Sequence, residues 1–261
     1  MTANPTTPAD TAHDIVLQTR SVAMRFGGLL ALGGIDLDVA RGERLAILGP
    51  NGAGKTTLFN VIAGDLRPTL GTVHIKGVDC TALPSRKRPA LGVARTYQKA
   101  RSFPGLTVWD NLYLAILGKQ GRHRSLWRNS TDHGWRERAA EAANAVWLED
   151  RLHSLVGGLS HGQKRQLELG MVVVTDPDVL LLDEPASGLS RGERERLMDL
   201  LDELAADTTL LIIEHDMDVA FRIARRVFVM ADGSKVAEGT PEEIRADPVV
   251  HEIYLGSEAA T

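Results

Sequence analysis

The amino-acid sequence predicts an α/β fold with a mostly parallel sheet, an N-terminal antiparallel β subdomain and a helical insertion. The first observation is a set of short segments that are apolar at every position, which is typical of strands buried on both faces of a parallel sheet. These segments are 45–48, 179–182, 210–213 and 227–230. The second observation is the helical pattern between them, because helices usually connect successive parallel strands.

Composition limits the function classes. The chain has 261 residues, a formal net charge of -4 at pH 7 and a single cysteine, Cys80. A lone cysteine cannot form an intramolecular disulfide, and it indicates a reducing compartment, by default the cytoplasm. The slightly acidic balance disfavours a generally basic nucleic-acid-binding protein, so no nucleic-acid partner is expected.

The N-terminal part of the chain changes character near residue 15. Residues 1–14 are polar and rich in Thr, Ala and Pro, and we interpret them as a mobile tail without a secretory signal. Residues 15–42 alternate short apolar stretches with glycine pairs at 27–28 and 33–34, which predicts antiparallel strands and turns. No segment approaches the roughly 20 apolar residues of a membrane span.

The segment after the first buried strand matches the phosphate-binding motif G-x-x-x-x-G-K-[ST], with a helix expected over 56–63. Its glycines let backbone N–H groups form a nest at the positive end of that helix, which suits the α- and β-phosphates of a nucleotide. Lys55 adds a charge for the β- and γ-phosphates, and the Thr56 hydroxyl can ligate Mg²⁺. The expected nucleotide-binding residues are Gly49, Pro50, Asn51, Gly52, Ala53, Gly54, Lys55, Thr56 and Thr57.

Two acidic residues follow the strand predicted at 179–182. Ligands of open α/β sheets bind at the carboxyl ends of the strands. We therefore expect Asp183 to hold Mg²⁺, directly or through water, and Glu184 to polarise the attacking water as a general base. Neighbouring strand residues point to opposite faces, so both acids can serve only if the strand ends there, which Pro185 favours.

The remaining chain contains a helical insertion and a C-terminal hairpin. Residues 107–158 lack strand-like runs, and the alanine-rich stretch 135–148 has a helical pattern. The pair Asp232-Gly233 predicts a hairpin turn. The segment 240–243 predicts a helix start, with Thr240 as N-cap and an acid three residues later.

A family resemblance enters at Leu159-Ser160-His161-Gly162-Gln163, which is similar to the L-S-G-G-Q signature of ATP-binding-cassette (ABC) ATPases. Gln98 resembles the Q-loop glutamine and His215 the switch histidine, and the order of the motifs along the chain is that of the family. The resemblance implies one ABC ATPase domain over 15–256, with a P-loop NTPase core, and a short tail at 257–261.

The resemblance also implies a head-to-tail dimer, in which each ATP lies between one subunit's P-loop and the other subunit's signature. Ser160, Gly162 and Gln163 would then bind the partner's ATP. Gln98 would sense Mg²⁺ or the attacking water and link the site to a partner, and His215 would contact the γ-phosphate and orient water.

One position has two interpretations, and two others depart from the family pattern. Phe26 lies where the family has an aromatic residue that stacks on adenine, and the alternative is a core phenylalanine of the β subdomain. His161 replaces a signature glycine, and Ser190 stands where many members have aspartate. These two departures leave every residue required for hydrolysis in place, but communication between the two ATP sites could differ.

Further segments resemble the ATPase subunits of bacterial branched-chain amino-acid uptake systems, whereas His161 resembles the urea and short-amide branch of that group. These segments are 25–32, 94–98, 213–217 and 254–256. The resemblance implies a peripheral ATPase on the cytoplasmic side of the membrane. It would power solute import through a separate permease, with an extracytoplasmic solute-binding protein.

Three further points stay open at this stage. The basic segment 119–128 is either a solvated surface or a contact with lipid headgroups or a permease. A soluble ABC protein that acts on nucleic acid or the ribosome is the alternative from another class. Such proteins generally have two cassettes or long coiled-coil insertions, which this sequence lacks.

A P-loop kinase or GTPase is disfavoured, because the signature has no use in a nucleoside kinase and the guanine-reading motif N-K-x-D is missing.

Overall fold

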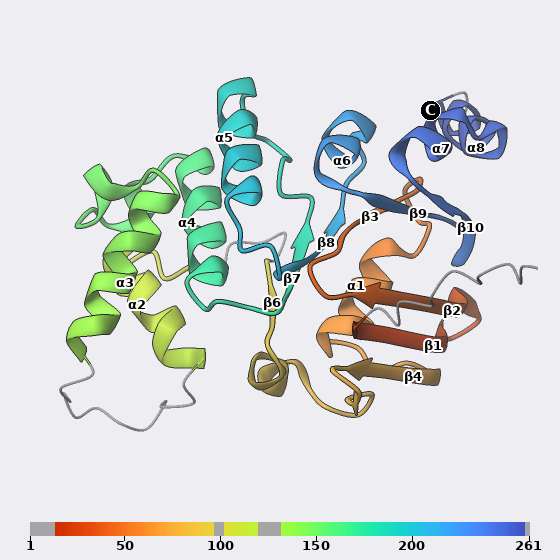
Figure 1. The fold of residues 1–261 in the computed structure, drawn as a ribbon, viewed down its shortest axis with the longest axis horizontal. Coiled ribbons are helices and arrows are strands. Elements are labelled where there is room, and N and C mark those ends of the chain that lie inside the picture. Colours follow the sequence, from red (N-terminus) through yellow and green to blue (C-terminus); the bar gives the residue numbers. More distant parts are fainter. Residues whose placement is uncertain (1–13, 97–101, 120–131, 259–261) are drawn as a thin grey trace, which may run out of the picture.

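The computed structural model describes residues 14–96, 102–119 and 132–258, and Figure 1 shows two sheets beside a group of helices. The smaller sheet has the strand order β2-β1-β4-β5, and all of its pairings are antiparallel. Its strands are β1 (Ile15–Phe26), β2 (Leu29–Ala40), β4 (Leu70–Ile75) and β5 (Val78–Asp79). The predicted antiparallel segment forms β1 and β2, whereas β4 and β5 were not predicted.

The larger sheet has the order β10-β9-β3-β8-β7-β6 and is parallel except for its edge strand β10. The four apolar segments of the sequence form its centre, so the predicted mostly parallel sheet is confirmed. Its strands are β3 (Arg44–Leu48), β6 (Val93–Arg95), β7 (Val179–Asp183), β8 (Thr209–Ile213), β9 (Arg226–Ala231) and β10 (Ser234–Gly239). The carboxyl ends of β3, β7 and β8 meet at one edge of this sheet.

Two hydrophobic clusters cover the two faces of the parallel sheet, which explains its continuous apolar strands. One cluster joins alternate residues of β3, β7, β8 and β9 to β1, β2 and the helix α1 (Lys55–Ala63). The other joins the opposite face to the remaining helices. Among those helices are α2 (Val108–Lys119), α3 (Asp132–Ala145), α4 (His161–Val173), α5 (Arg191–Asp202) and α6 (Met217–Ile223).

The helical layer contains α2, α3 and α4 packed together, so it extends beyond the predicted insertion 107–158 to the helix that follows the signature. The short 3₁₀ segments are η1 (Ser85–Leu91), η2 (Glu149–Arg151) and η3 (Val156–Gly158). In the described part of the chain, no helix is both long enough and apolar enough to cross a membrane. Residues 120–128 of the basic segment 119–128, Gln98 and residues 1–13 lie outside the described residues.

The C-terminal signals are confirmed. Asp232 and Gly233 both have positive φ, 47° and 74°, in the tight turn between β9 and β10. Thr240 caps the helix α7 (Pro241–Ala246) in a reciprocal capping box with Glu243. The chain then forms α8 (Pro248–Glu258), which packs against α7 and β10.

Candidate functional site

The P-loop, residues 49–57, connects the carboxyl end of β3 to the start of α1. Gly49 has a φ of 147°, and a Cβ at this position would overlap the carbonyl oxygen of Met230. Gly54 has a φ of 94°, and a Cβ there would lie 2.6 Å from the carbonyl oxygen of Ala31. Only glycine fits both the backbone conformation and the space at these two positions, so the motif keeps its glycines for steric reasons.

Lys55 is buried at the base of the loop. Its Nζ donates to the carbonyl oxygens of Gly49 at 2.5 Å and Pro50 at 2.9 Å. Burial lowers the pKa of the Lys55 ammonium, and the negative charges of Glu184 and Asp183 oppose this shift. The loop therefore carries a partly desolvated positive charge that faces two carboxylates, an arrangement suited to an anionic ligand with a bound cation.

A cavity of about 580 Å³ lies over the P-loop, and Glu184 and the turn Asp232-Gly233 also line it. Phe26 forms part of its wall and is 46% exposed, so it is not a core residue of the β subdomain. The cavity has the size expected of a small-molecule site. The predicted residues that line it are Phe26, Asn51, Gly52, Ala53, Gly54, Lys55, Thr56, Thr57 and Glu184.

Asp183 ends β7 and is 1% exposed. Its Oδ2 accepts a hydrogen bond from Arg95 at 2.9 Å, and its buried Oδ1 has no hydrogen-bond partner in the described part of the chain. A buried carboxylate oxygen without a partner is costly, unless it binds a cation. No group of three His, Cys, Asp or Glu residues within the described ranges could hold a metal alone. The single free carboxylate oxygen of Asp183 fits Mg²⁺, because this ion usually binds one or two carboxylates together with substrate phosphates.

Glu184 leaves the strand with a φ of 47°, and its backbone N–H donates to the carbonyl of Ile213 at 2.9 Å. This turn removes the strand alternation, so Glu184 reaches the cavity over the P-loop. Arg165, buried in α4, supports the turn. Its Nη2 donates to the carbonyl oxygens of Asp183 at 2.8 Å and Glu184 at 3.0 Å.

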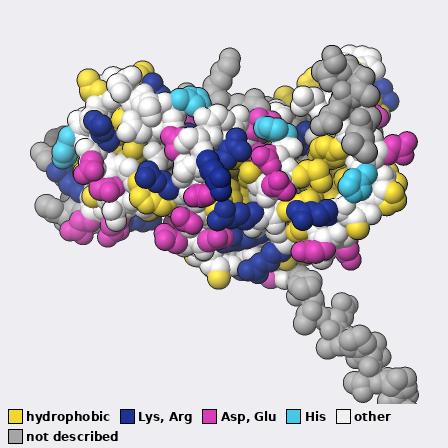
Figure 2. All heavy atoms as spheres, turned by 90° about the horizontal axis from the view of Figure 1, so that it is seen from above, with side chains coloured by type: hydrophobic (Ala, Val, Ile, Leu, Met, Phe, Trp, Pro, Cys, Tyr) yellow, Lys and Arg dark blue, Asp and Glu magenta, His cyan; other side chains and the backbone are white. Residues whose placement is uncertain are grey.

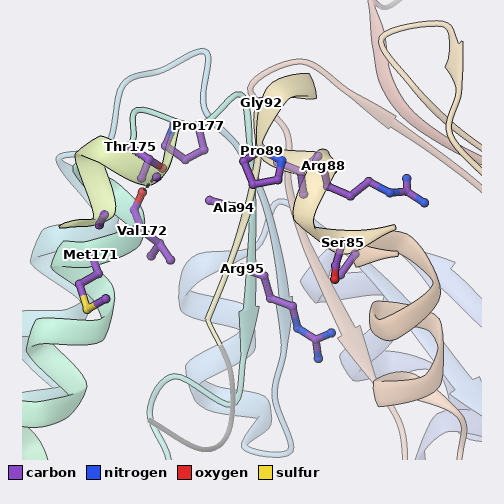
Figure 3. A pocket seen from close by; sticks show the side chains of 14 residues that line it. Ser85, Arg88, Pro89, Gly92, Ala94, Arg95, Met171, Val172, Thr175 and Pro177 are labelled. Carbon is purple, nitrogen blue, oxygen red and sulfur yellow. Dashed lines mark hydrogen bonds between the residues drawn. The ribbon is translucent and has the colours of Figure 1, made fainter. Parts of the chain in front are cut away.

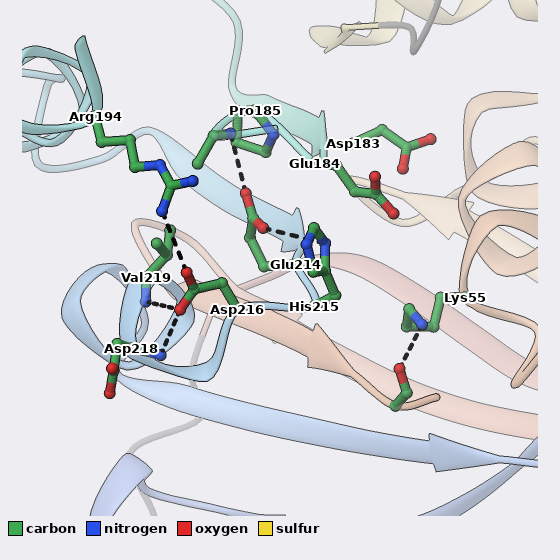
Figure 4. Close-up of polar contacts among 12 residues, drawn as sticks. Lys55, Asp183, Glu184, Pro185, Arg194, Glu214, His215, Asp216, Asp218 and Val219 are labelled. Carbon is green, nitrogen blue, oxygen red and sulfur yellow. Dashed lines mark hydrogen bonds and ion pairs between the residues drawn. The ribbon is translucent and has the colours of Figure 1, made fainter. Parts of the chain in front are cut away.

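His215 follows β8, and its side chain is 60% exposed beside the buried Glu214 (Figure 4). The Nδ1 atom of His215 lies 4.0 Å from Oε2 of Glu214. The other oxygen of Glu214 accepts a hydrogen bond from the backbone N–H of Ala186 at 3.1 Å. Burial raises the pKa of the Glu214 carboxyl, and the Ala186 N–H opposes this shift. Glu214 therefore connects the segment after Glu184 to the histidine loop.

The signature residues start α4. Ser160 caps the helix by accepting from the N–H of Gln163 at 3.2 Å, and Gln163 Oε1 accepts from the N–H of Ser160 at 3.0 Å. A Cβ at Gly162 would overlap the carboxylate of Glu193. No described residue of the signature lines the cavity over the P-loop. Within one chain, the described signature residues therefore lie outside the cavity over the P-loop.

Both departures from the family pattern have local partners. The imidazole of His161 lies beside Gly188, close enough that a Cβ on that glycine would be 3.2 Å from its Nε2. Ser190 caps α5 in a capping box with Glu193. The signature and the segment after Glu184 therefore touch within one chain.

A family model described as ABC transporter matches residues 32–187. The chain belongs to the ABC transporter family. A second family model, described as branched-chain amino acid ATP-binding cassette transporter, matches residues 234–260 of this ABC ATPase.

Curated relatives match this ABC ATPase over nearly their full length. The high-affinity branched-chain amino acid transport ATP-binding protein LivG of Escherichia coli strain K12 is 38% identical over 250 residues, which is 92% of this chain and 98% of LivG. BraF of Pseudomonas aeruginosa, with the same description, is 38% identical over 255 residues and covers 92% and 98%. A probable LivG of Methanocaldococcus jannaschii is 31% identical over 250 residues, with 92% and 97% covered.

Solved ATP-binding cassettes have the same fold. The ADP conformation of MJ1267, an ATP-binding cassette of an ABC transporter, superposes with a TM-score of 0.81 at 30% identity, covering 93% of this chain and 99% of the other. A dimeric structure of the bacterial ABC transporter cassette MJ0796 gives 0.76 at 26% identity, with 86% and 98% covered. The expected ABC ATPase fold is therefore confirmed.

Sequence reasoning missed four residues of this ABC ATPase that contact the predicted site. Arg95 and Arg165 bind the Asp183–Glu184 segment, and the Tyr254 hydroxyl accepts a hydrogen bond from the P-loop backbone at Gly49. Glu214 lies in the segment 213–217 that carried part of the family resemblance, but no role was predicted for Glu214 itself. The contacts of Arg95, Arg165 and Tyr254 join residues far apart in sequence, so no spacing rule could have found them.

Proposed function

We propose that this ABC ATPase powers the uptake of branched-chain or other hydrophobic amino acids through a separate permease, at the cytoplasmic side of the membrane. The convergence of the P-loop and Glu184 on one cavity, with Asp183 beside it, carries the catalytic part of the proposal. The relatives named for branched-chain amino acid transport support the choice of solute.

ATP would lie in the cavity over the P-loop, with its phosphates on the backbone N–H groups at the start of α1. Lys55 would turn from the Gly49 and Pro50 carbonyls to the β- and γ-phosphates, because these carbonyls are weaker partners than a phosphate anion. Phe26 would stack on the adenine at the exposed edge.

Mg²⁺ would be held by Oδ1 of Asp183, the Thr56 hydroxyl and, as the resemblance implies, Gln98. When bound, it neutralises charge on the β- and γ-phosphates. Arg95 orients the carboxylate of Asp183 through Oδ2, so that Oδ1 remains for the cation.

Glu184 would accept a proton from the attacking water. The water oxygen then bonds to the γ-phosphorus as the bond from that phosphorus to the β–γ bridging oxygen breaks, which yields ADP and phosphate. His215 would donate a hydrogen bond to the γ-phosphate and help to orient the water. The exposure of its side chain leaves the imidazole accessible to the nucleotide.

A second ABC ATPase subunit, identical or homologous, would complete each site head to tail. Ser160, Gly162 and Gln163 of one subunit would then meet the γ-phosphate bound by the other. Two observations support this pairing: no described signature residue lines the cavity over the P-loop of its own chain, and a dimeric cassette is among the structural neighbours.

The permease would dock on a groove of about 310 Å³ between η1, β6 and the helices α2 and α4 (Figure 3). Its walls are mostly apolar, with Ala94, Met171 and Val172 among the lining residues. The strand β6 leads directly into the segment that contains Gln98. This position supports the proposed link between Gln98 and the permease, which would itself receive solute from an extracytoplasmic binding protein.

The catalytic proposal is tested with the purified chain, ATP and Mg²⁺. Glu184→Gln should abolish hydrolysis, retain ATP binding and accumulate an ATP-bound dimer on size-exclusion chromatography, because the general base is removed and the charge reduced. Glu141→Gln, the same change at an exposed site in α3, serves as the control. Hydrolysis that persists in Glu184→Gln would refute the role of Glu184.

The solute is tested in the reconstituted complex with its permease. Stimulation of ATP hydrolysis by leucine or valine with the binding protein supports the proposal, and stimulation by urea or a short amide would transfer it to that branch. Co-purification with RNA and without a permease would favour the nucleic-acid alternative. On the face in Figure 2, Lys and Arg side chains lie beside Asp and Glu side chains, which does not favour a phosphate backbone.

A further inference from the structure

The first residue of the P-loop is hydrogen-bonded to the far end of the chain. The backbone N–H of Gly49 donates to the hydroxyl of Tyr254 in α8, with a distance of 2.8 Å. We propose that Tyr254 is a positioning residue of the ATP site, which holds the first peptide of the P-loop in the conformation that receives the phosphates.

The sheet itself provides no partner for this N–H. The pairing of β3 with β8 ends at Ile47, and its pairing with β9 ends at Leu48. Gly49 therefore lies just beyond both ladders, where a backbone donor needs another acceptor. The Tyr254 hydroxyl is that acceptor, so it continues the hydrogen bonding of β3 by one residue into the loop.

The same residue contacts the lysine of the motif. The carbonyl oxygen of Gly49 accepts from Lys55 Nζ at 2.5 Å. Gly49 thus donates its N–H to Tyr254 and accepts from Lys55 through its carbonyl oxygen. Its Cα lies so close to Met230 that a Cβ would overlap the carbonyl oxygen of that residue. A shift of the Gly49 backbone would therefore move the carbonyl oxygen to which Lys55 is bonded before it turns to the nucleotide phosphates.

Tyr254 is presented by a helix with its own anchors. Asp247 caps the start of α8 by accepting from the N–H groups of Val249 at 2.8 Å and Val250 at 3.3 Å. The side chain of Val250 is 1% exposed in the core, and α8 packs against α7 and β10. Burial raises the pKa of the Tyr254 phenol, which keeps the hydroxyl protonated and neutral at physiological pH.

The C-terminal part of the chain touches the P-loop at a second point. The N–H of Gly233, in the turn between β9 and β10, donates to the carbonyl oxygen of Ala53 at 3.1 Å. The P-loop is thus held at Gly49 by α8 and at Ala53 by the hairpin turn. The family model for the C-terminal region begins at 234 and includes Tyr254. Under this proposal, that region therefore contributes a residue that positions the nucleotide site.

The test uses the full chain and rests on the proposed role of the P-loop in binding ATP. Tyr254→Phe removes the hydroxyl but keeps the ring and the packing of α8. Because one neutral hydrogen bond is lost, the Kd for a fluorescent ATP analogue with Mg²⁺ should rise about two- to tenfold. Amide exchange of Gly49, measured by NMR without nucleotide, should accelerate while the amides of residues 45–47 in β3 remain protected. Tyr113→Phe, the same change in α2, should alter neither value.

Each outcome has a distinct meaning. Equal Kd values in wild type and Tyr254→Phe would refute the role of Tyr254, and so would unchanged exchange at Gly49. A lower melting temperature with an unchanged Kd would show a purely structural tyrosine, which also refutes it. A wild-type chain that fails to bind the analogue would instead refute the nucleotide site itself.

Discussion

The Nη2 atom of Arg95 lies 2.9 Å from Oδ2 of Asp183, and both side chains are buried. The two residues end neighbouring parallel strands, β6 and β7. Nη1 of Arg95 also donates to Oδ1 of Asn60 in α1 at 2.7 Å. One guanidinium therefore connects the proposed magnesium ligand to the helix that follows the P-loop, and it forms an ion pair with the buried carboxylate of Asp183.

Arg95→Met should destabilise the fold strongly, because it leaves Asp183 as a buried charge without its cation. Breaking a buried pair by removing one partner costs about 3–5 kcal/mol in the free energy of unfolding. The surface pair of Arg20 and Asp38, with side chains 43% and 44% exposed, is the control. Arg20→Met should cost at most about 1 kcal/mol. Urea unfolding measures both values, and equal costs would contradict this account of Arg95.

Ser160→Ala and Thr240→Ala remove the same structural feature from two helices, because both residues cap through a reciprocal box. Each should lower the free energy of unfolding by about 1 kcal/mol. Only Ser160→Ala should also weaken ATP-dependent dimerisation, measured by light scattering on a Glu184→Gln background, because Ser160 is proposed to meet the partner's ATP. Equal dimerisation of both variants would leave Ser160 with its capping role alone.

Glu214→Gln should change how stability depends on pH. Burial raises the folded-state pKa of Glu214 above its ordinary value of 4.5, so the folded chain binds this proton more tightly than the unfolded chain. This contribution to stability is complete below about pH 4.5 and is lost as the pH rises through the folded-state pKa. The stability of Glu214→Gln relative to wild type should therefore increase from pH 4.5 to 7.5, as measured by urea unfolding at several pH values. A constant difference would contradict the prediction.

Phe26→Ala should weaken ATP binding, because its exposed ring forms part of the wall of the cavity over the P-loop. The loss of a stacked ring corresponds to about 0.5–1.5 kcal/mol, or a two- to tenfold rise in Kd. Phe26→Tyr should retain the wild-type affinity for ATP, since the aromatic face is kept. Phe103→Ala, at a ring that is 53% exposed, is the control. Unchanged affinity in Phe26→Ala would show that adenine does not rest on this ring.

The sequence predicted those features that depend on neighbouring residues. Continuous apolar runs located the central strands, and capping and turn residues located the 232–233 turn and the helix start at Thr240. The strand β6, with three residues, is too short for its pattern to be recognised. The antiparallel strand β4 has no run that distinguishes it from a loop.

The contacts that shape the site depend on topology instead. Arg95 and Asp183 are far apart in sequence, and they meet only because β6 and β7 are neighbours in the sheet. Tyr254 reaches Gly49 because β9 lies beside β3 and the chain returns over the P-loop through α7 and α8. Strand order cannot be read from the segments alone, so these partners could not be predicted.

The hydrogen bonds of Arg165 have a consequence for a pair of such subunits. They join the helix that begins with the signature to the backbone of Asp183 and Glu184 in the same chain. In the proposed head-to-tail dimer, that signature belongs to one ATP site and that glutamate to the other. In such a dimer, each polypeptide would connect the two ATP sites, and the hydrogen bonds of Arg165 would be part of that connection.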